Sequence, residues 1–295
     1  MTRRGVDLTR ADGLKRGQLA GFERAHLIEN FGEEEWALDS PGAGPDGSEP
    51  PPRYARGVSG PTLALVSAVL YTVGDGKEAT AYCCRASPEA PFELALAKIY
   101  RATKFRAFAN AARYRAGEKL PDRRAQKAIE QNSRRGRDMG HTTWVEREWN
   151  TLCMLHDMGA DVPTPYACTA NAILMEYFGD ETTPAPLLLR VDLERAEAER
   201  LFERLVQNVE LFLACDRIHG DLSAYNVLYD AGKIWIIDFP QAVDARTHPN
   251  ARALLERDLS NLARPFERSG LRTRARERAR ELFERYRRGE LGIDD

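Results

Sequence analysis

Residues 219–226 of the chain read His-Gly-Asp-Leu-Ser-Ala-Tyr-Asn, and residues 236–239 read Ile-Ile-Asp-Phe. Between these two stretches, the apolar segments 226–229 and 233–238 are joined by Asp-Ala-Gly, a combination that predicts a β-hairpin with a tight turn. Asn226 and Asp238 end the two strands of this hairpin, so the turn brings Asp238 back beside Asn226. Asp221 lies five residues before Asn226 in the same loop. All three polar side chains can therefore face one cleft.

This arrangement is typical of sites that transfer a phosphoryl group from ATP. Such sites need oxygen ligands that hold Mg²⁺ against the phosphates, and a carboxylate that orients or deprotonates the acceptor. In kinase-type sites the first Asp orients the acceptor, while the Asn and the second Asp bind the metal. We therefore assign a catalytic role to Asp221 and metal binding to Asn226 and Asp238. Taken singly, each is better explained as a turn or strand-end residue, and only the combination is specific. We expect His219 to bond the backbone of the loop.

A glycine-rich turn upstream supplies a candidate phosphate-binding loop, Gly74-Asp75-Gly76-Lys77-Glu78-Ala79. It lies between two predicted strands, and glycines let backbone N–H groups approach a phosphate closely. We assign Gly74, Gly76 and Lys77 to ATP binding, although in isolation an ordinary hairpin turn is the better explanation of this segment. Because the turn does not open a helix, it does not indicate a dinucleotide-binding fold.

A single lysine interrupts the apolar strand predicted over residues 94–100. Lys98 fits the lysine that grips the α- and β-phosphates of ATP, and an exposed strand lysine is the alternative. Such a lysine needs a carboxylate partner on a neighbouring helix. The predicted helix 144–155 offers Glu148, which we favour because Leu152 and Leu155 on the next turn should face the core; Glu146 is the other candidate.

The apolar segment 173–178, Ile-Leu-Met-Glu-Tyr-Phe, is predicted to be a buried strand linking two lobes. We expect adenine to bond backbone atoms around Glu176 and Phe178, with Met175 beside it. A plain core strand is the alternative. Together with Lys98 and Glu148, these residues complete the predicted ATP-binding set.

Composition limits the class of protein. Hydrophobic residues make up 43% and charged residues 30% of the 295 residues, which is typical of a globular protein with a core. The formal net charge of −2 excludes a uniformly basic nucleic-acid coat. Five cysteines form no CxxC pair, and no apolar run is long enough to span a bilayer. We expect a cytoplasmic protein with reduced thiols.

Short strands precede long helices along the chain, which favours an α+β fold with two lobes. We predict strands over 63–73, 79–85 and 94–100, followed later by helices over 196–215, 254–262 and 274–286. A linker rich in Pro and Gly at 40–52 separates an N-terminal extension, 1–60, from a main domain, 61–295. The N-lobe is expected over 61–175 and the C-lobe over 176–295.

Several motifs together resemble the RIO family of atypical protein kinases, in its RIO1-like branch, from about residue 73 to residue 262. They are GDGKEA, LALAKIY, WVEREWNTL, ILMEYFG, HGDLSAYNVLYDAGKIWIIDFPQAVD and HPNARALLERDLSNL. The resemblance implies a compact, two-lobed, protein-kinase-like fold that uses ATP and Mg²⁺ as a serine/threonine kinase or an ATPase. It also implies that Asp238 can itself take the phosphoryl group, and that the partner is a maturing small ribosomal subunit.

Two departures from ordinary kinases predict slow transfer to proteins. Ser223 stands where ordinary kinases have a lysine, and only 57 residues follow Asp238, with no A-P-E motif. The fold should therefore lack an activation segment and its substrate-binding helices. A small-molecule phosphotransferase of the aminoglycoside-kinase type is the alternative enzyme, and a pseudokinase scaffold is the alternative outside enzymes. The scaffold is disfavoured because the chain retains Lys98, Asp221, Asn226 and Asp238 together.

Residues 101–138 carry twelve Lys or Arg and four Asp or Glu. The resemblance makes this segment a mobile loop between the lysine strand and the following helix. Clustered basic residues gain affinity by neutralising phosphates, so an RNA-facing patch is one interpretation and a solvated loop is the other. We expect ribosomal RNA or a pre-ribosomal particle as the partner of this segment.

Overall fold

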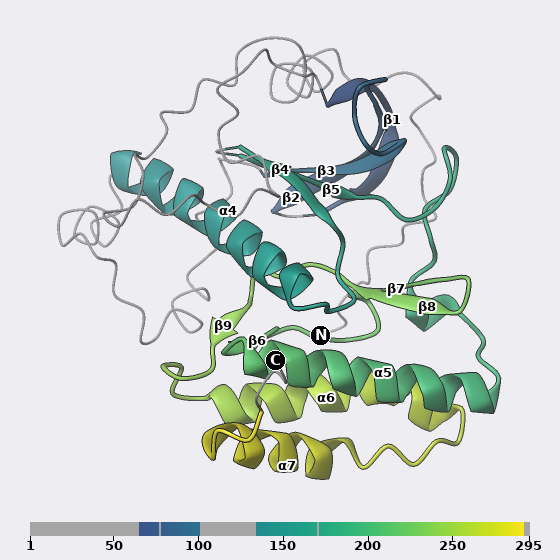
Figure 1. Ribbon diagram of the computed structural model, residues 1–295, viewed down its shortest axis with the longest axis vertical. Coiled ribbons are helices and arrows are strands. Elements are labelled where there is room, and N and C mark those ends of the chain that lie inside the picture. Colours follow the sequence, from purple (N-terminus) through teal and green to yellow (C-terminus); the bar gives the residue numbers. More distant parts are fainter. Residues whose placement is uncertain (1–64, 77, 101–133, 170, 292–295) are drawn as a thin grey trace, which may run out of the picture. The chain divides into compact units, whose positions relative to one another are not determined.

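The computed structural model describes residues 65–76, 78–100, 134–169 and 171–291, and for residues 134–143 only the backbone (Figure 1). Within these residues the chain forms two compact units. The first contains the strands up to Tyr100 together with Thr164–Pro184, and the second contains one earlier helix and the chain from Ala185 onward. The fold is α+β, as the sequence predicts.

A five-stranded antiparallel sheet makes up the first unit, in the order β1-β2-β3-β5-β4 (Figure 1). Its strands are β1 (Val66–Asp75), β2 (Ala79–Ala86), β3 (Leu94–Tyr100), β4 (Pro165–Cys168) and β5 (Ala172–Glu176). The strands predicted from sequence over 63–73, 79–85 and 94–100 correspond to β1, β2 and β3. Strand β4 was not predicted, because its four residues are too few to show a clear alternating pattern on their own.

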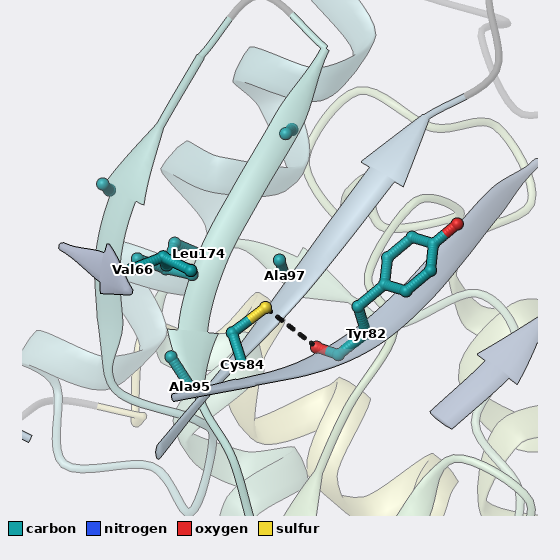
Figure 2. Packing of buried hydrophobic residues seen from close by; sticks show 8 residues of the cluster. Val66, Tyr82, Cys84, Ala95, Ala97 and Leu174 are labelled. Atoms are coloured by element: carbon teal, nitrogen blue, oxygen red, sulfur yellow. Dashed lines mark hydrogen bonds between the residues drawn. The ribbon is translucent and has the colours of Figure 1, made fainter. Parts of the chain in front are cut away.

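One face of this sheet is packed with small residues. Ala95 and Ala97 of β3 are fully buried beside Cys84 and Leu174, and Figure 2 shows these side chains together with Val66 and Tyr82. Burial raises the pKa of the Cys84 thiol to about 12, so the thiol stays protonated. This buried thiol behaves as a small apolar core residue.

Four helices and two short antiparallel ribbons are described in the second unit. The helices are α4 (Arg134–Asp157), α5 (Arg195–Ala214), α6 (Ala251–Arg268) and α7 (Ala275–Arg287). The ribbons pair β6 (Arg217–Ile218) with β9 (Val243–Asp244) and β7 (Val227–Asp230) with β8 (Lys233–Ile236), and a 3₁₀ turn covers Leu188–Arg190.

Helices α5, α6 and α7 pack side by side in this unit (Figure 1). One apolar face of α5 is buried: Leu201, Leu205, Val209 and Phe212 are each at most 3% exposed. The ring of Phe202 lies 5.3 Å from that of Phe266 on α6, measured between ring centroids. This core holds α5 and α6 together, and the loops of the candidate site described below lie against these two helices.

Two sequence expectations differ from the structure. Helix α4 begins at Arg134, ten residues before the predicted start at 144, so residues 134–138 of the expected basic loop are helical. The expected lobes met near residue 175, whereas the structural units exchange the chain after Pro163 and after Pro184. The expected N-terminal extension, 1–60, lies outside the described residues. Within the described ranges, no helix is long and apolar enough to cross a bilayer.

Candidate active site

The predicted catalytic loop connects β6 to β7 and is held by hydrogen bonds to helix α6. At its start, the Gly220 N–H donates to Asp258 Oδ2 at 2.7 Å, and Arg257 donates to the Gly220 carbonyl. Asp258 lies on α6 and is 1% exposed. The loop is therefore tied to a helix that follows it by more than thirty residues in the sequence.

Glycine is required at position 220. Its φ is +80°, and a Cβ built there would lie 2.2 Å from the carbonyl oxygen of Gln241. Both the left-handed backbone and this close approach exclude a side chain. The loop carrying Asp221 and the chain that follows Asp238 thus lie in direct backbone contact.

His219 has the structural role that we expected. It is 2% exposed; its Nδ1 accepts a hydrogen bond from the Asp221 N–H at 3.3 Å, and its Nε2 lies 3.1 Å from the Ile237 carbonyl oxygen. An Nδ1 that accepts leaves Nε2 as the donor, which defines the neutral tautomer. His219 thus joins the backbone N–H of Asp221 to the carbonyl of Ile237, the residue before Asp238.

The Asp258 carboxyl is buried and accepts hydrogen bonds from the Gly220 N–H and the Arg257 guanidinium. Burial raises the pKa of its carboxyl to about 7, while the Arg257 guanidinium and the Gly220 N–H oppose that rise. Asp258 was not predicted from the sequence, although the apolar spacing of α6 places it on the buried face with Leu254, Leu255, Leu259 and Leu262. An acidic residue among helical core positions was the available signal.

The structure brings the predicted metal ligands together through backbone bonds. The Ile237 N–H donates to the Asn226 carbonyl at 3.0 Å, so Asn226 and Asp238 flank the open end of the β7–β8 hairpin. The Asn226 side-chain Nδ2 donates to the Asp221 carbonyl at 2.9 Å. Asp221 and Asp238 are both exposed. The three residues of the predicted motif are therefore linked within one unit.

The donor set fits a magnesium ion. Because Asn226 uses its Nδ2 in the bond to the loop, its Oδ1 is the side-chain atom left to act as an oxygen ligand. Asp238 has φ +73°, a left-handed conformation that is uncommon outside glycine and recurs at functional sites. Carboxylate and amide oxygens with substrate phosphates are the usual surroundings of Mg²⁺ in phosphoryl-transfer sites.

Phe239 anchors the residue that follows the candidate metal-binding Asp. It is 3% exposed, and its ring lies 4.9 Å from the His219 ring and 5.8 Å from that of Phe212, measured between centroids. The turn at Asp238 is thus fixed on one side by the buried Phe239. On the other side it is fixed by the Ile237 backbone bonds.

In the sheet unit, the register places the predicted lysine level with the glycine loop. Gly74 of β1 and Lys98 of β3 both pair with Ala81 of β2. Two interstrand spacings separate them, about 10 Å. The Gly76 N–H donates to the Ala79 carbonyl at 2.9 Å and closes the turn. Phosphate binding by this turn stays a prediction, and Lys77 lies outside the described residues.

The predicted adenine strand is β5, which pairs with β3 on one side and β4 on the other. Met175 and Phe178 are buried. The Glu176 carboxylate accepts hydrogen bonds from the Thr164 N–H at 3.0 Å and from the Thr164 hydroxyl at 2.7 Å. The Glu176 side chain is thus bonded to the start of β4, and its backbone role toward adenine stays a prediction.

Of the two glutamates on α4, Glu148 is 4% exposed and Glu146 is exposed. Leu152 and Leu155 are buried, as expected. Glu148 therefore lies on the inward face of the helix. It belongs to the second unit and Lys98 to the first, and their pairing stays a prediction.

Comparison with known proteins gives the family. The family model described as the RIO domain matches residues 80–279. The chain is 35% identical over 129 residues to the serine/threonine-protein kinase RIO1 of Caenorhabditis elegans, and this match covers 43% of this chain and 25% of that protein.

Two further relatives extend the match. Identity to the RIO-type serine/threonine-protein kinase Rio1 of Thermoplasma acidophilum is 33% over 130 residues, 44% of this chain and 67% of that protein. The chain is 31% identical over 220 residues to the serine/threonine-protein kinase RIO1 of Chaetomium thermophilum, and this match covers 71% of this chain and 41% of that protein. The match to the C. elegans protein covers only a quarter of that protein's length. The RIO-domain model matches more than half of the residues of this chain, and the chain therefore belongs to the RIO family.

Proposed function

We propose that the chain is an ATP-dependent phosphotransferase of RIO type, a serine/threonine kinase or ATPase that labels itself and turns over slowly. One observation carries the proposal: Asn226 Nδ2 bonds to the Asp221 carbonyl, and the Asn226 carbonyl accepts from the Ile237 N–H. With the peptide link from Ile237 to Asp238, these bonds connect the three polar residues that the proposed phosphoryl transfer would use. The names of the relatives, serine/threonine-protein kinases, support the same activity.

Each residue has a chemical role in this proposal. When bound, Mg²⁺ neutralises charge that develops on the transferred phosphoryl group. Asn226 and Asp238 would supply oxygen ligands for it. The exposed Asp221 carboxylate would accept the proton of the attacking hydroxyl group or water. Asp238, as the family resemblance implies, would also be the site of self-labelling.

Ser223 favours slow turnover. Its hydroxyl lies 3.4 Å from the Tyr225 N–H, within the loop itself. A serine in this position supplies no positive charge for the γ-phosphate, so transition-state stabilisation is weaker than in kinases with a lysine there. Membership of the RIO family favours this function over the aminoglycoside-kinase alternative.

For the finer role, we propose that the protein acts in the cytoplasm in maturation of the small ribosomal subunit. The basic segment 101–138 would bind ribosomal RNA or a pre-ribosomal particle. Twelve Lys or Arg in that segment support the proposal, in a chain whose overall net charge is −2.

Titration calorimetry with ATP, with and without Mg²⁺, tests the proposed site. Wild-type protein should bind ATP more tightly with Mg²⁺, and Asp238→Ala should lose that difference. Asp230→Ala is the matched control, because Asp230 is an exposed carboxylate at the turn end of the same hairpin. An Asp238→Ala variant with the full Mg²⁺ effect would overturn the proposal.

A further inference from the structure

A polar network at the end of α4 bonds directly to the hairpin that carries the candidate metal ligands. Asp161 lies in the connection between α4 and β4. Arg204 of α5 donates to its carboxylate through Nε at 2.6 Å and through Nη2 at 2.8 Å, a bidentate pair. Asn208, one turn further along α5, is fully buried.

Asn208 uses every hydrogen-bonding atom of its side chain. Its Oδ1 accepts from the Asp161 N–H at 2.6 Å, and its Nδ2 donates to Asp161 Oδ2 at 2.7 Å and to the Arg204 carbonyl at 2.9 Å. A buried amide that is fully bonded holds its partners in one geometry. The network therefore fixes both the backbone and the side chain of Asp161 against α5.

The remaining polar group of Asp161 bonds to the hairpin. Its carbonyl accepts the Ile236 N–H of β8 at 2.8 Å. A two-stranded hairpin is only marginally stable alone, so bonds along its outer edges decide where it lies. The opposite edge has such a bond too, from the Tyr229 N–H to the Pro186 carbonyl at 2.9 Å.

A continuous chain of hydrogen bonds results. It runs from α5 through Asp161 to Ile236, and the next residue, Ile237, donates to the Asn226 carbonyl. Asn226 in turn donates to the Asp221 carbonyl. The residue after Ile237 is Asp238. We propose that Asp161, held by Arg204 and Asn208, is a positioning residue that sets the place of β8 and thereby the geometry of the Asn226–Asp238 metal pair.

The inference rests on the proposed role of Asn226 and Asp238 toward Mg²⁺. Asp161 acts on this pair through β8, by way of the bond from the Ile236 N–H to its carbonyl. Removing its carboxylate takes away the Arg204 pair and the bond from Asn208 Nδ2. Only the bond from the Asp161 N–H to Asn208 Oδ1 then holds this segment to α5, so the Asp161 carbonyl is less firmly fixed. The Ile236 bond weakens, and the metal pair loses its spacing.

The test compares Asp161→Ala with a matched ion-pair control. Glu203, also on α5, forms a bidentate pair with Arg278 of α7, with Glu203 Oε2 at 2.6 Å from Arg278 Nη2. Glu203→Ala therefore removes an ion pair of the same kind, but one that joins α5 to α7 instead of to the connection before β4. Both variants would be examined for amide hydrogen exchange without metal, and for Mn²⁺ affinity with adenylyl imidodiphosphate.

In Asp161→Ala, exchange of the Ile236 and Ile237 amides should accelerate, and Mn²⁺ affinity should fall about tenfold, the scale for residues that orient metal ligands. Glu203→Ala should leave both at wild-type values. Equal behaviour of the two variants would overturn the inference. Should Asp161→Ala not fold, Arg204→Lys keeps the charge but loses the bidentate geometry. In Arg204→Lys, amide exchange and Mn²⁺ affinity should both change in the same direction, by less than in Asp161→Ala. Wild-type exchange and affinity in Arg204→Lys would likewise overturn the inference.

Failure of the proposed function gives a different result. In that case the wild-type protein itself would show no Mn²⁺ affinity with the analogue. An unchanged Ile236 exchange in Asp161→Ala, beside normal wild-type Mn²⁺ binding, would contradict only the positioning role.

Discussion

The Asn226 side chain donates from Nδ2 to the main-chain carbonyl of Asp221 at 2.9 Å, which joins a candidate metal ligand to the candidate acceptor-orienting residue. In the proposed site the amide would therefore have two functions, one on each atom. Nδ2 bonds the loop that carries Asp221, and Oδ1 would serve as the metal ligand. These functions can be separated by substitution.

Asn226→Asp keeps a ligand oxygen but removes the donor to the Asp221 carbonyl. We expect Mg²⁺-dependent ATP binding to persist and kcat to fall about tenfold, the effect of removing one hydrogen bond of about 1 kcal/mol together with repulsion at the carbonyl. Asn226→Ala should lose both binding and turnover. Mg²⁺ titrations of ATP binding and steady-state turnover measure the two effects. Wild-type kcat in Asn226→Asp would show that the loop bond has no catalytic consequence.

Gly220→Ala should destabilise the protein by more than backbone strain alone. A left-handed alanine costs about 1 kcal/mol, and the Cβ at 2.2 Å from the Gln241 carbonyl adds a clash that only a backbone shift relieves. Gly270→Ala is the control, since Gly270 has φ +84° and nothing within 4 Å of a Cβ. Urea unfolding of both should show a larger decrease in stability at Gly220, by about 1 kcal/mol or more. Equal decreases would contradict the close approach.

Asp258 gives the protein a pH dependence of known sign. Its folded pKa of about 7 lies above the ordinary value of about 3.9. Between these two pH values the carboxyl is therefore mostly protonated in the folded state and mostly ionised in the unfolded state. The contribution to the free energy of unfolding is full below about pH 4 and is lost as pH rises through 7. The slope is at most about 1.4 kcal/mol per pH unit.

Unfolding measured from about pH 5 to about pH 8 checks this dependence. The stability of wild type relative to Asp258→Asn should fall as pH rises, because Asn does not titrate. Asp230→Asn, at an exposed carboxylate, should leave the wild-type pH profile in place. A wild-type and Asp258→Asn difference that stays constant over this range would refute the raised pKa.

The basic segment is predicted to bind RNA in a salt-sensitive way. Replacing Arg134, Arg135 and Arg137 with Ala should weaken binding and flatten its salt dependence, by about 0.7–0.9 in slope for each phosphate that is no longer neutralised. The same number of charges removed at exposed positions elsewhere, Arg264, Arg268 and Arg272, should have less effect. Filter binding across salt concentrations measures both. If the wild-type protein does not bind RNA at low salt, the RNA-binding interpretation is wrong and the solvated-loop interpretation holds.

Local signals predicted the hairpin well. Asp230-Ala231-Gly232 indicated a turn, and Ala231 and Gly232 do take positive φ values, +46° and +81°, as a two-residue hairpin loop requires. Asn226 and Asp238 could be placed together for this reason alone. The start of α4 was missed because residues 134–143 carry few apolar positions, which leaves no helical periodicity to detect.

Long-range polar contacts could not be predicted. Asp258 bonds to Gly220 across 38 residues, and Asn208 bonds to Asp161 across 47. Neither pair has a local pattern, and polar residues on a helix are usually solvent-facing. Their only signal is position: each lies among buried apolar residues of its own helix, which is where a polar side chain needs a partner from elsewhere in the fold.

Incubation with radiolabelled ATP and a panel of acceptors tests the central claim most directly, that the site is a slow RIO-type phosphotransferase. We expect label on the protein itself, abolished in Asp221→Ala while that variant still binds ATP, and only slow release of phosphate. Rapid labelling of an aminoglycoside or a similar small alcohol, with turnover on the order of 10 s⁻¹ and no labelled protein, would contradict the account.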